Sequence, residues 1–159
     1  MSMLRLSLCV TALATVLTGS VLAQAPPSPS AAKRAVDERK AIFTLIGGNF
    51  RPIGEQLQGR VSLDSSQARK RAERLAFLAA LASDAFSDVS NVGDPATRAK
   101  PEIWSNRAQF DQVVADFVKH SQALAQVVAT QAPGSDAFKA AAGAVAQDCK
   151  SCHDNFRAK

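Results

Sequence analysis

SDAFKAAAGAVAQDCKSCHDNFR, residues 135–157, is the stretch that decides the fold of this chain. Its apolar side chains recur at alternating spacings of four and three residues, the period of one helix face: Phe138, Ala142, Val145, Cys149, Cys152 and Phe156. Ser135 precedes them and can cap the helix by accepting a hydrogen bond from a first-turn N–H group. Because such a helix is apolar on one face only, it needs other helices to cover that face.

Three other stretches have apolar side chains at the same helical spacing: residues 36–57, 68–86 and 110–128. Asp64 or Ser65 can cap the second helix, and Gly59 can end the first. The glycines at 47 and 48, together with Pro52, weaken the first helix and predict a bend there. In no stretch do apolar and polar residues alternate as they do in a half-buried β-strand. The sequence therefore predicts an all-α fold, an antiparallel up-down-up-down four-helix bundle.

The composition agrees with a single helical domain. The chain has 159 residues, 47% of them hydrophobic, which suits one domain of roughly 100–150 residues. It has no tyrosine and few other aromatics, which argues against a β-sandwich, and three cysteines are too few for a disulfide framework. The 19 Lys and Arg exceed the 14 Asp and Glu. They are scattered over helix faces, however, so we expect no nucleic-acid partner.

The first 23 residues have the layout of a secretory signal peptide. Arg5 precedes an apolar run, and small residues then lead to Ala23. A retained membrane anchor is the alternative, but it would need about 20 strongly apolar residues. We expect cleavage after Ala23, a flexible leader over residues 24–32 and a bundle domain over residues 33–159. The mature protein would then be periplasmic, without a membrane segment, and would have lost both methionines and the first cysteine.

The chemistry lies in the C-x-x-C-H motif formed by Cys149, Cys152 and His153. Residues three and four apart share a helix face, so both thiols can reach the vinyl groups of one porphyrin while the imidazole reaches its iron. A zinc site usually needs four ligands, and the predicted mature chain has just two cysteines and two histidines. A thioredoxin-like cysteine pair would need an α/β fold, which the helical pattern does not predict. A disulfide between residues three apart on a helix would be strained. The motif therefore predicts one covalently attached haem c, with His153 as iron ligand.

A C-x-x-C-H motif close to the end of a helical bundle resembles the cytochrome c′ family. The resemblance extends over residues 38–40, 100–105 and 149–157. It implies that Lys40 and Arg98 contact the haem and that the protein is a homodimer formed through the first two helices. Two positions depart from the family pattern, because Lys40 replaces a common amide or arginine and Phe156 replaces a frequent tyrosine.

The ligand opposite His153 decides between two kinds of haem protein. Low-spin relatives in the family place a methionine on the first helix, whereas this chain has only Met1 and Met3, within the predicted signal peptide. His120 is the remaining candidate. In the predicted topology the residues around 110–117 reach the haem level and His120 lies about a turn beyond. We therefore expect five-coordinate, high-spin iron; the alternative is a six-coordinate, low-spin electron-transfer cytochrome with His120 as second ligand.

Three further residues are candidates for the haem surroundings. Phe43 lies on the apolar stripe at the expected level, and the resemblance places the same position over the open side of the iron. Arg39 falls within that stripe, and because a buried charge needs a partner, a haem propionate is the expected one. The alternatives are ordinary core packing for Phe43 and a guanidinium that reaches water for Arg39. Arg157, four residues after His153, can screen the proximal side or be a plain exposed charge.

These expectations lead to a function without catalysis. An apolar wall over the iron offers no hydrogen-bond donor, which NO and CO need less than O2 does. A peroxidase would need a polar distal His or Arg. The sequence therefore predicts a protein that binds NO or CO, transfers electrons to or from a redox partner protein, or does both, and that is not an enzyme.

Overall fold

The computed structural model describes residues 28–92 and 97–159, so the predicted signal peptide and residues 24–27 of the predicted leader lie outside the described residues. The helices are α1 (Pro29–Leu57), α2 (Ser65–Ala80), α3 (Glu102–Ser105), α4 (Arg107–Thr130) and α5 (Asp136–Phe156), with two 3₁₀ turns, η1 (Asp84–Phe86) and η2 (Asp88–Ser90), between α2 and α3. The first helix begins inside the predicted leader, where the Ser28 hydroxyl accepts a hydrogen bond from the N–H of Ala31.

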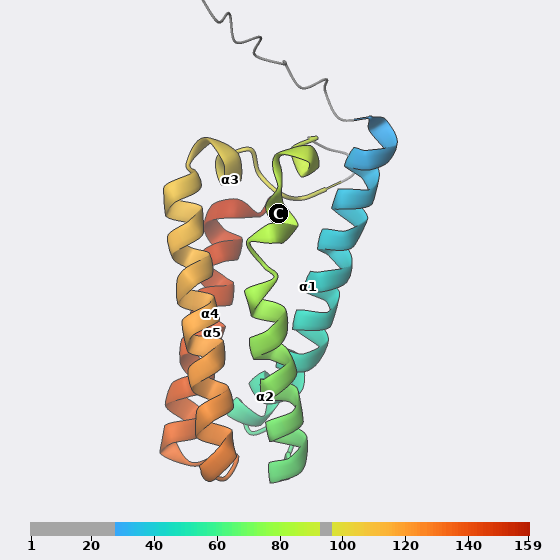
Figure 1. Ribbon diagram of the computed structural model, residues 1–159. Helices are drawn as coiled ribbons and strands as arrows, with labels where there is room; N and C mark the ends of the chain where they lie inside the picture. Colours follow the sequence, from blue (N-terminus) through green and yellow to red (C-terminus); the bar gives the residue numbers. More distant parts are fainter. Residues whose placement is uncertain (1–27, 93–96) are drawn as a thin grey trace, which may run out of the picture.

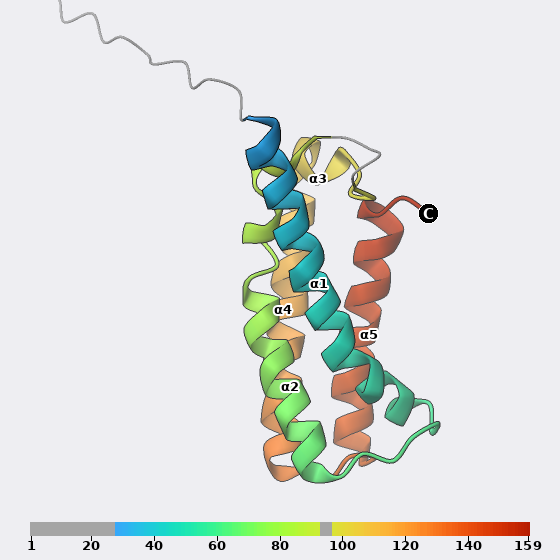
Figure 2. The same ribbon diagram turned by 90° about the vertical axis from the view of Figure 1, so that its right-hand side faces the viewer.

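The four long helices form an antiparallel bundle. Figures 1 and 2 show α1, α2, α4 and α5 side by side, each running opposite to the one before it, with α3 as a single turn at one end. The predicted topology is thereby confirmed. It brings the last turns of α5, which carry the C-x-x-C-H motif, level with the first half of α1 and with the connection between α2 and α4 (Figure 1).

The helix ends follow local signals in the sequence. Asp64 accepts a hydrogen bond from the N–H of Gln67, and Ser135 accepts one from the N–H of Phe138. Gly59 follows the end of α1 with a positive φ of 70°, a conformation that glycine adopts without steric cost. These expectations are confirmed.

The extent of the second helix was predicted wrongly. The apolar stripe continues to Phe86, but α2 ends at Ala80. Beyond it, the N–H groups of Ala82 and Phe86 bond to carbonyls three residues back, which tightens the chain into 3₁₀ turns. Phe86 is still only 7% exposed. Phe86 belongs to the apolar stripe because its side chain is buried, but its backbone lies in a 3₁₀ turn and not in the helix.

Pro52 affects how α1 packs on α2. Its missing N–H leaves the carbonyl of Gly48 without its intrahelical donor, and the Arg71 guanidinium of α2 donates to that oxygen at 3.3 Å. The last turns of α1 leave the line of the rest of the helix in Figure 2, in agreement with the predicted bend. The helix itself is continuous through the glycines and Pro52.

The core lies along the axis of the bundle. The largest fully buried apolar side chains come from all four long helices and from α3: Val36, Ile53, Leu75, Ile103, Phe110, Leu124, Val128, Phe138 and Val145. None of the described helices has a stretch that is both long and apolar enough to span a membrane.

Candidate haem-binding site

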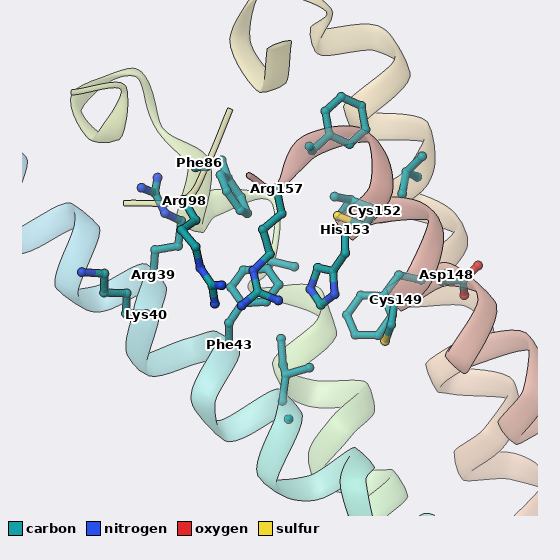
Figure 3. A pocket seen from close by; sticks show the side chains of 18 of the residues that line it. Arg39, Lys40, Phe43, Phe86, Arg98, Asp148, Cys149, Cys152, His153 and Arg157 are labelled. Atoms are coloured by element: carbon teal, nitrogen blue, oxygen red, sulfur yellow. The ribbon is translucent and has the colours of Figure 1, made fainter. Parts of the chain in front are cut away.

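A cavity of about 990 Å³ opens between α1 and the last turns of α5. Pockets that hold small molecules and cofactors range over about 300–1,000 Å³, so this one can hold a large ligand. The eight residues predicted to hold or contact the haem all line it: Arg39, Lys40, Phe43, Arg98, Cys149, Cys152, His153 and Arg157. In Figure 3 the imidazole of His153 and the ring of Phe43 are turned toward the same space. The structure thus brings the predicted residues together; their individual roles remain predictions.

The α5 wall of the cavity carries the two thiols and the imidazole. Cys149 and Cys152 are free and partly buried. Burial raises the pKa of each thiol to about 11, with a smaller contribution from Asp148 at Cys149. Burial therefore favours the neutral thiol form of both side chains. The described residues contain no cluster of three or more His, Cys, Asp or Glu that could hold a metal ion by itself.

Nine residues of α1 line the cavity, and five of them share one helix face: Lys40, Phe43, Thr44, Gly47 and Arg51. The hydroxyl of Thr44 donates to the carbonyl of Lys40 at 2.8 Å, so its proton is not available to a ligand. Sequence reasoning missed Arg51, although its spacing of eleven residues from Lys40, three helical turns, would have placed it on this face.

Aromatic rings in edge-to-face contact close the end of the cavity. The ring centroid of Phe86 lies 5.5 Å from that of Phe43 and 4.8 Å from that of Phe110, which in turn lies 5.4 Å from Phe156. Phe86 therefore joins α1 to α4 from its position in η1. Its part in the site could not be read from the sequence, where it belongs to the stripe of the second helix.

Arg39 is buried in the cavity wall, with 4% of its surface exposed. It donates hydrogen bonds to the Ser90 hydroxyl at 2.7 Å and the Thr97 hydroxyl at 2.9 Å. Its guanidinium carbon lies 5.0 Å from the ring centre of Phe86 and 5.8 Å from that of Trp104. The expected burial is confirmed and a guanidinium that reaches water is excluded. Its partners within the chain are these two hydroxyls, the backbone carbonyl of Ser90 at 3.4 Å and the two aromatic rings, which hold α1 to the connection between α2 and α4.

Arg39→Leu is expected to lower the free energy of unfolding by about 3 kcal/mol, because it leaves buried hydroxyls without their charged donor. Chemical denaturation measures this loss. Arg34→Leu is the matched control: Arg34 is exposed on the same helix, and its replacement should change the stability by no more than about 0.5 kcal/mol. Equal losses in the two variants would contradict the role given to Arg39.

Arg98 and Arg157 are held opposite each other by backbone pairing. Ala99 and Arg157 form an isolated antiparallel bridge. The N–H of Lys100 donates to the carbonyl of Phe156 at 3.0 Å, and the N–H of Ala158 donates to the carbonyl of Arg98 at 2.8 Å. This bridge places both exposed guanidinium groups at the opening of the cavity. It joins segments far apart in the chain, and nothing in the sequence indicated it.

His120 does not line the cavity. Its Nδ1 lies 2.8 Å from Oδ2 of Asp148, so the ring pairs α4 with α5 outside the cavity. Burial raises the pKa of the Asp148 carboxyl above its usual value, against the opposing effect of the hydrogen bond with His120. By contrast Phe110, Val114 and Phe117, the earlier turns of the same helix, do line the cavity, at the level that the topology predicted.

The cavity fits a c-type haem. It offers two free thiols and an imidazole on one helix face, apolar walls for a porphyrin ring, and cationic side chains for its two carboxylates. Residues 34–157 match the family model described as Cytochrome C′. The chain belongs to the cytochrome c′ family. Members of this family are haem-binding proteins and electron carriers in which the c-type haem is covalently attached.

Relatives cover most of the chain. A cytochrome c′ of Rhodopseudomonas palustris is 34% identical over 78% of this chain and 82% of its own length. A cytochrome c′ of Alcaligenes xylosoxydans is also 34% identical, over 79% of this chain and 94% of its own. Among solved structures, the nitric oxide complex of a variant cytochrome c prime from Alcaligenes xylosoxidans superposes with a TM-score of 0.71 at 31% identity, over 80% of this chain and 97% of that one.

Proposed function

We propose that this protein is a periplasmic haem protein whose five-coordinate, high-spin iron binds NO and CO. The observation that carries the proposal is the wall that faces His153. The described lining contains no methionine and no second histidine, and Phe43 of α1 lines the same cavity as the His153 imidazole of α5. A cytochrome c prime of this family has been solved as a nitric oxide complex, which supports the same ligand class here.

The proposal gives the cysteines, the histidine and the cationic side chains of the cavity different roles in holding the haem. Cys149 and Cys152 tether the cofactor through two thioethers, and His153 supplies the axial imidazole. When bound, the haem supplies the iron that takes up a diatomic gas or an electron. Arg39 and Lys40 on α1, together with the pair at the cavity opening, Arg98 and Arg157, are placed to compensate its carboxylates.

The apolar wall sets the choice among gases. Phe43 and Ile46 offer no hydrogen-bond donor, and the hydroxyl of Thr44 is already engaged with a backbone carbonyl. Bound O2 is polar and is stabilised by a donor, whereas NO and CO depend on one far less. We therefore expect NO and CO to bind in preference to O2. Electron transfer through the same cofactor is compatible with this role, because it needs only an accessible haem.

The test is an optical spectrum of the purified ferrous protein with and without CO and NO. We expect high-spin bands in the free protein and a new spectrum on addition of either gas. Low-spin bands that do not change with CO would refute an open coordination position.

His120→Ala is expected to leave the ferric and ferrous spectra unchanged, because His120 is paired with Asp148 outside the cavity. The measurement is the optical spectrum of both oxidation states. His153→Ala is the contrasting variant, since it removes the proposed axial ligand and should change both spectra. A change from low-spin to high-spin bands in His120→Ala would instead identify His120 as the second ligand.

We also propose a homodimer formed through α1 and α2, in line with the family resemblance. Leu45 on α1 and Phe77 on α2 are 54% and 69% exposed, and a dimer formed through these helices would remove their apolar surface from water. Sedimentation equilibrium of the exported protein tests this assembly, and a monomer at micromolar concentration would refute it.

A further inference from the structure

A five-residue pattern occurs twice in α1, seven residues apart. Residues 43–47 read FTLIG and residues 50–54 read FRPIG. Each begins with a phenylalanine and ends with a glycine four residues later, so that ring and glycine share one helix face. Neither glycine has a positive φ, and glycine is less stable than alanine inside a helix. The backbone conformation therefore does not account for either glycine.

The two phenylalanine rings lie differently toward their glycines. A Cβ atom at Gly54 would be 3.6 Å from Cε1 of Phe50, so the edge of that ring lies against its glycine. A Cβ atom at Gly47 would be in open space: apart from its two chain neighbours, no described residue brings a side chain within 4 Å, Phe43 included. Phe43 instead contacts Phe86, with ring centroids 5.5 Å apart. The position that Phe50 takes at Gly54 is thus open to Phe43 at Gly47.

Gly47 lies at the middle of the helix face that α1 turns to the cavity. At 100° per residue, Lys40, Phe43 and Arg51 lie within about 40° of it around the helix axis, and all three line the cavity. The other neighbour of the Phe43 ring is fixed: Phe86 is 7% exposed and packs on Phe110 at 4.8 Å between ring centroids. A Phe43 ring that moves therefore finds space toward Gly47 and a packed side chain toward Phe86.

We propose that Gly47 determines how readily the α1 side of the iron opens to a gas, because it leaves the space that receives the Phe43 ring. The inference rests on the proposed function, since it requires NO or CO to bind on this side of the haem. The ring leaves Phe86 when the gas binds, lies against Gly47 as Phe50 lies against Gly54, and returns when the gas leaves. Gly47 touches neither gas nor iron in this account. It is a positioning residue that acts through the ring.

Filling the space at Gly47 tests the inference. Gly47→Val adds a branched, stiff side chain next to the backbone, so we expect the rate constant of CO binding to the ferrous, haem-loaded protein to fall at least about fivefold. Flash photolysis measures it. Gly47→Ala is the matched control, because it removes the same glycine but adds a single methyl group in open space, and it should stay within about twofold of the wild type. Equal slowing by Ala and Val would assign the effect to a stiffer helix and overturn the proposal.

A double variant separates space for the ring from a path for the gas. In Phe43→Ala no ring has to move, so the addition of Gly47→Val should leave the CO rate constant within about twofold of that of Phe43→Ala alone. If Gly47→Val slowed CO by the same factor in both backgrounds, the space would be an entrance for the gas, and the proposal would be overturned.

The crystal structure of the CO complex gives a readout that does not depend on rates. We expect the Phe43 ring against Gly47, with its centroid farther from that of Phe86 than the present 5.5 Å. A ring that keeps its contact with Phe86 in the complex would contradict the inference. Loss of covalent haem from Gly47→Val, measured by mass, would also contradict it, since the space would then belong to the cofactor. Failure of the proposed function is distinguishable, because the wild type itself would then form no CO complex.

Discussion

The double variant Cys149→Ala, Cys152→Ala is expected to lose all covalently bound haem. The two thiols lie on one face of α5 within the cavity wall, and they are the only cysteines among the described residues. Thioether bonds survive denaturation, whereas coordination of iron by an imidazole, the role proposed for His153, does not. Mass spectrometry of the denatured, exported protein should therefore give the mass of the polypeptide plus haem for the wild type and of the polypeptide alone for the variant.

The single variants separate the two tethers. Cys149→Ala and Cys152→Ala each keep one thiol in reach of a vinyl group, so each should retain covalent haem through one bond. His120→Ala is the control outside the cavity and should keep the wild-type mass. Covalent haem in the double variant, or its absence from the wild type, would refute the tethering that the rest of the site depends on.

The fold was predictable because its determinants are local. The helix period located all four long helices, and single capping side chains marked where two of them begin, Asp64 for α2 and Ser135 for α5. At Phe86 the same pattern correctly predicted a buried side chain but wrongly predicted a helical backbone. A period of 3.6 residues reports which side chains are buried; it does not distinguish the end of a helix from 3₁₀ turns that keep the same face inward.

The site was predictable in its members but not in its internal contacts. Helical spacing predicted Phe43 and Arg39 at the level of the C-x-x-C-H motif, and the family resemblance added Lys40 and Arg98; all four line the cavity. The partners of Arg39 were not predictable, since Ser90 and Thr97 are 51 and 58 residues away in the chain. The backbone pairing of Ala99 with Arg157 was not predictable either, because it also joins residues far apart in the chain. Spacing describes one helix at a time and contains no information about contacts between irregular segments.

Phe43→Ala is expected to increase the rate constant of CO binding to the ferrous protein at least about tenfold, equivalent to lowering the barrier by about 1.4 kcal/mol. The side chain lies in the α1 wall and faces the same space as the His153 imidazole (Figure 3). Its ring is fixed by edge-to-face contact with Phe86, which is itself packed against Phe110. A ring held in this way cannot swing aside freely, so an incoming gas has to wait for it to move, and truncation to a methyl group removes that obstacle.

The comparison that makes this result specific is with Phe77→Ala. Phe77 is 69% exposed on α2 and does not line the cavity, so its truncation should leave the CO rate constant within about twofold of the wild type, as for an exposed side chain remote from the site. Flash photolysis measures both variants at the same protein concentration. An accelerated Phe43→Ala beside an unchanged Phe77→Ala assigns the barrier to the α1 wall. Equal rates in all three proteins would mean that the gas enters by another route, and that the selectivity proposed for NO and CO cannot be attributed to Phe43.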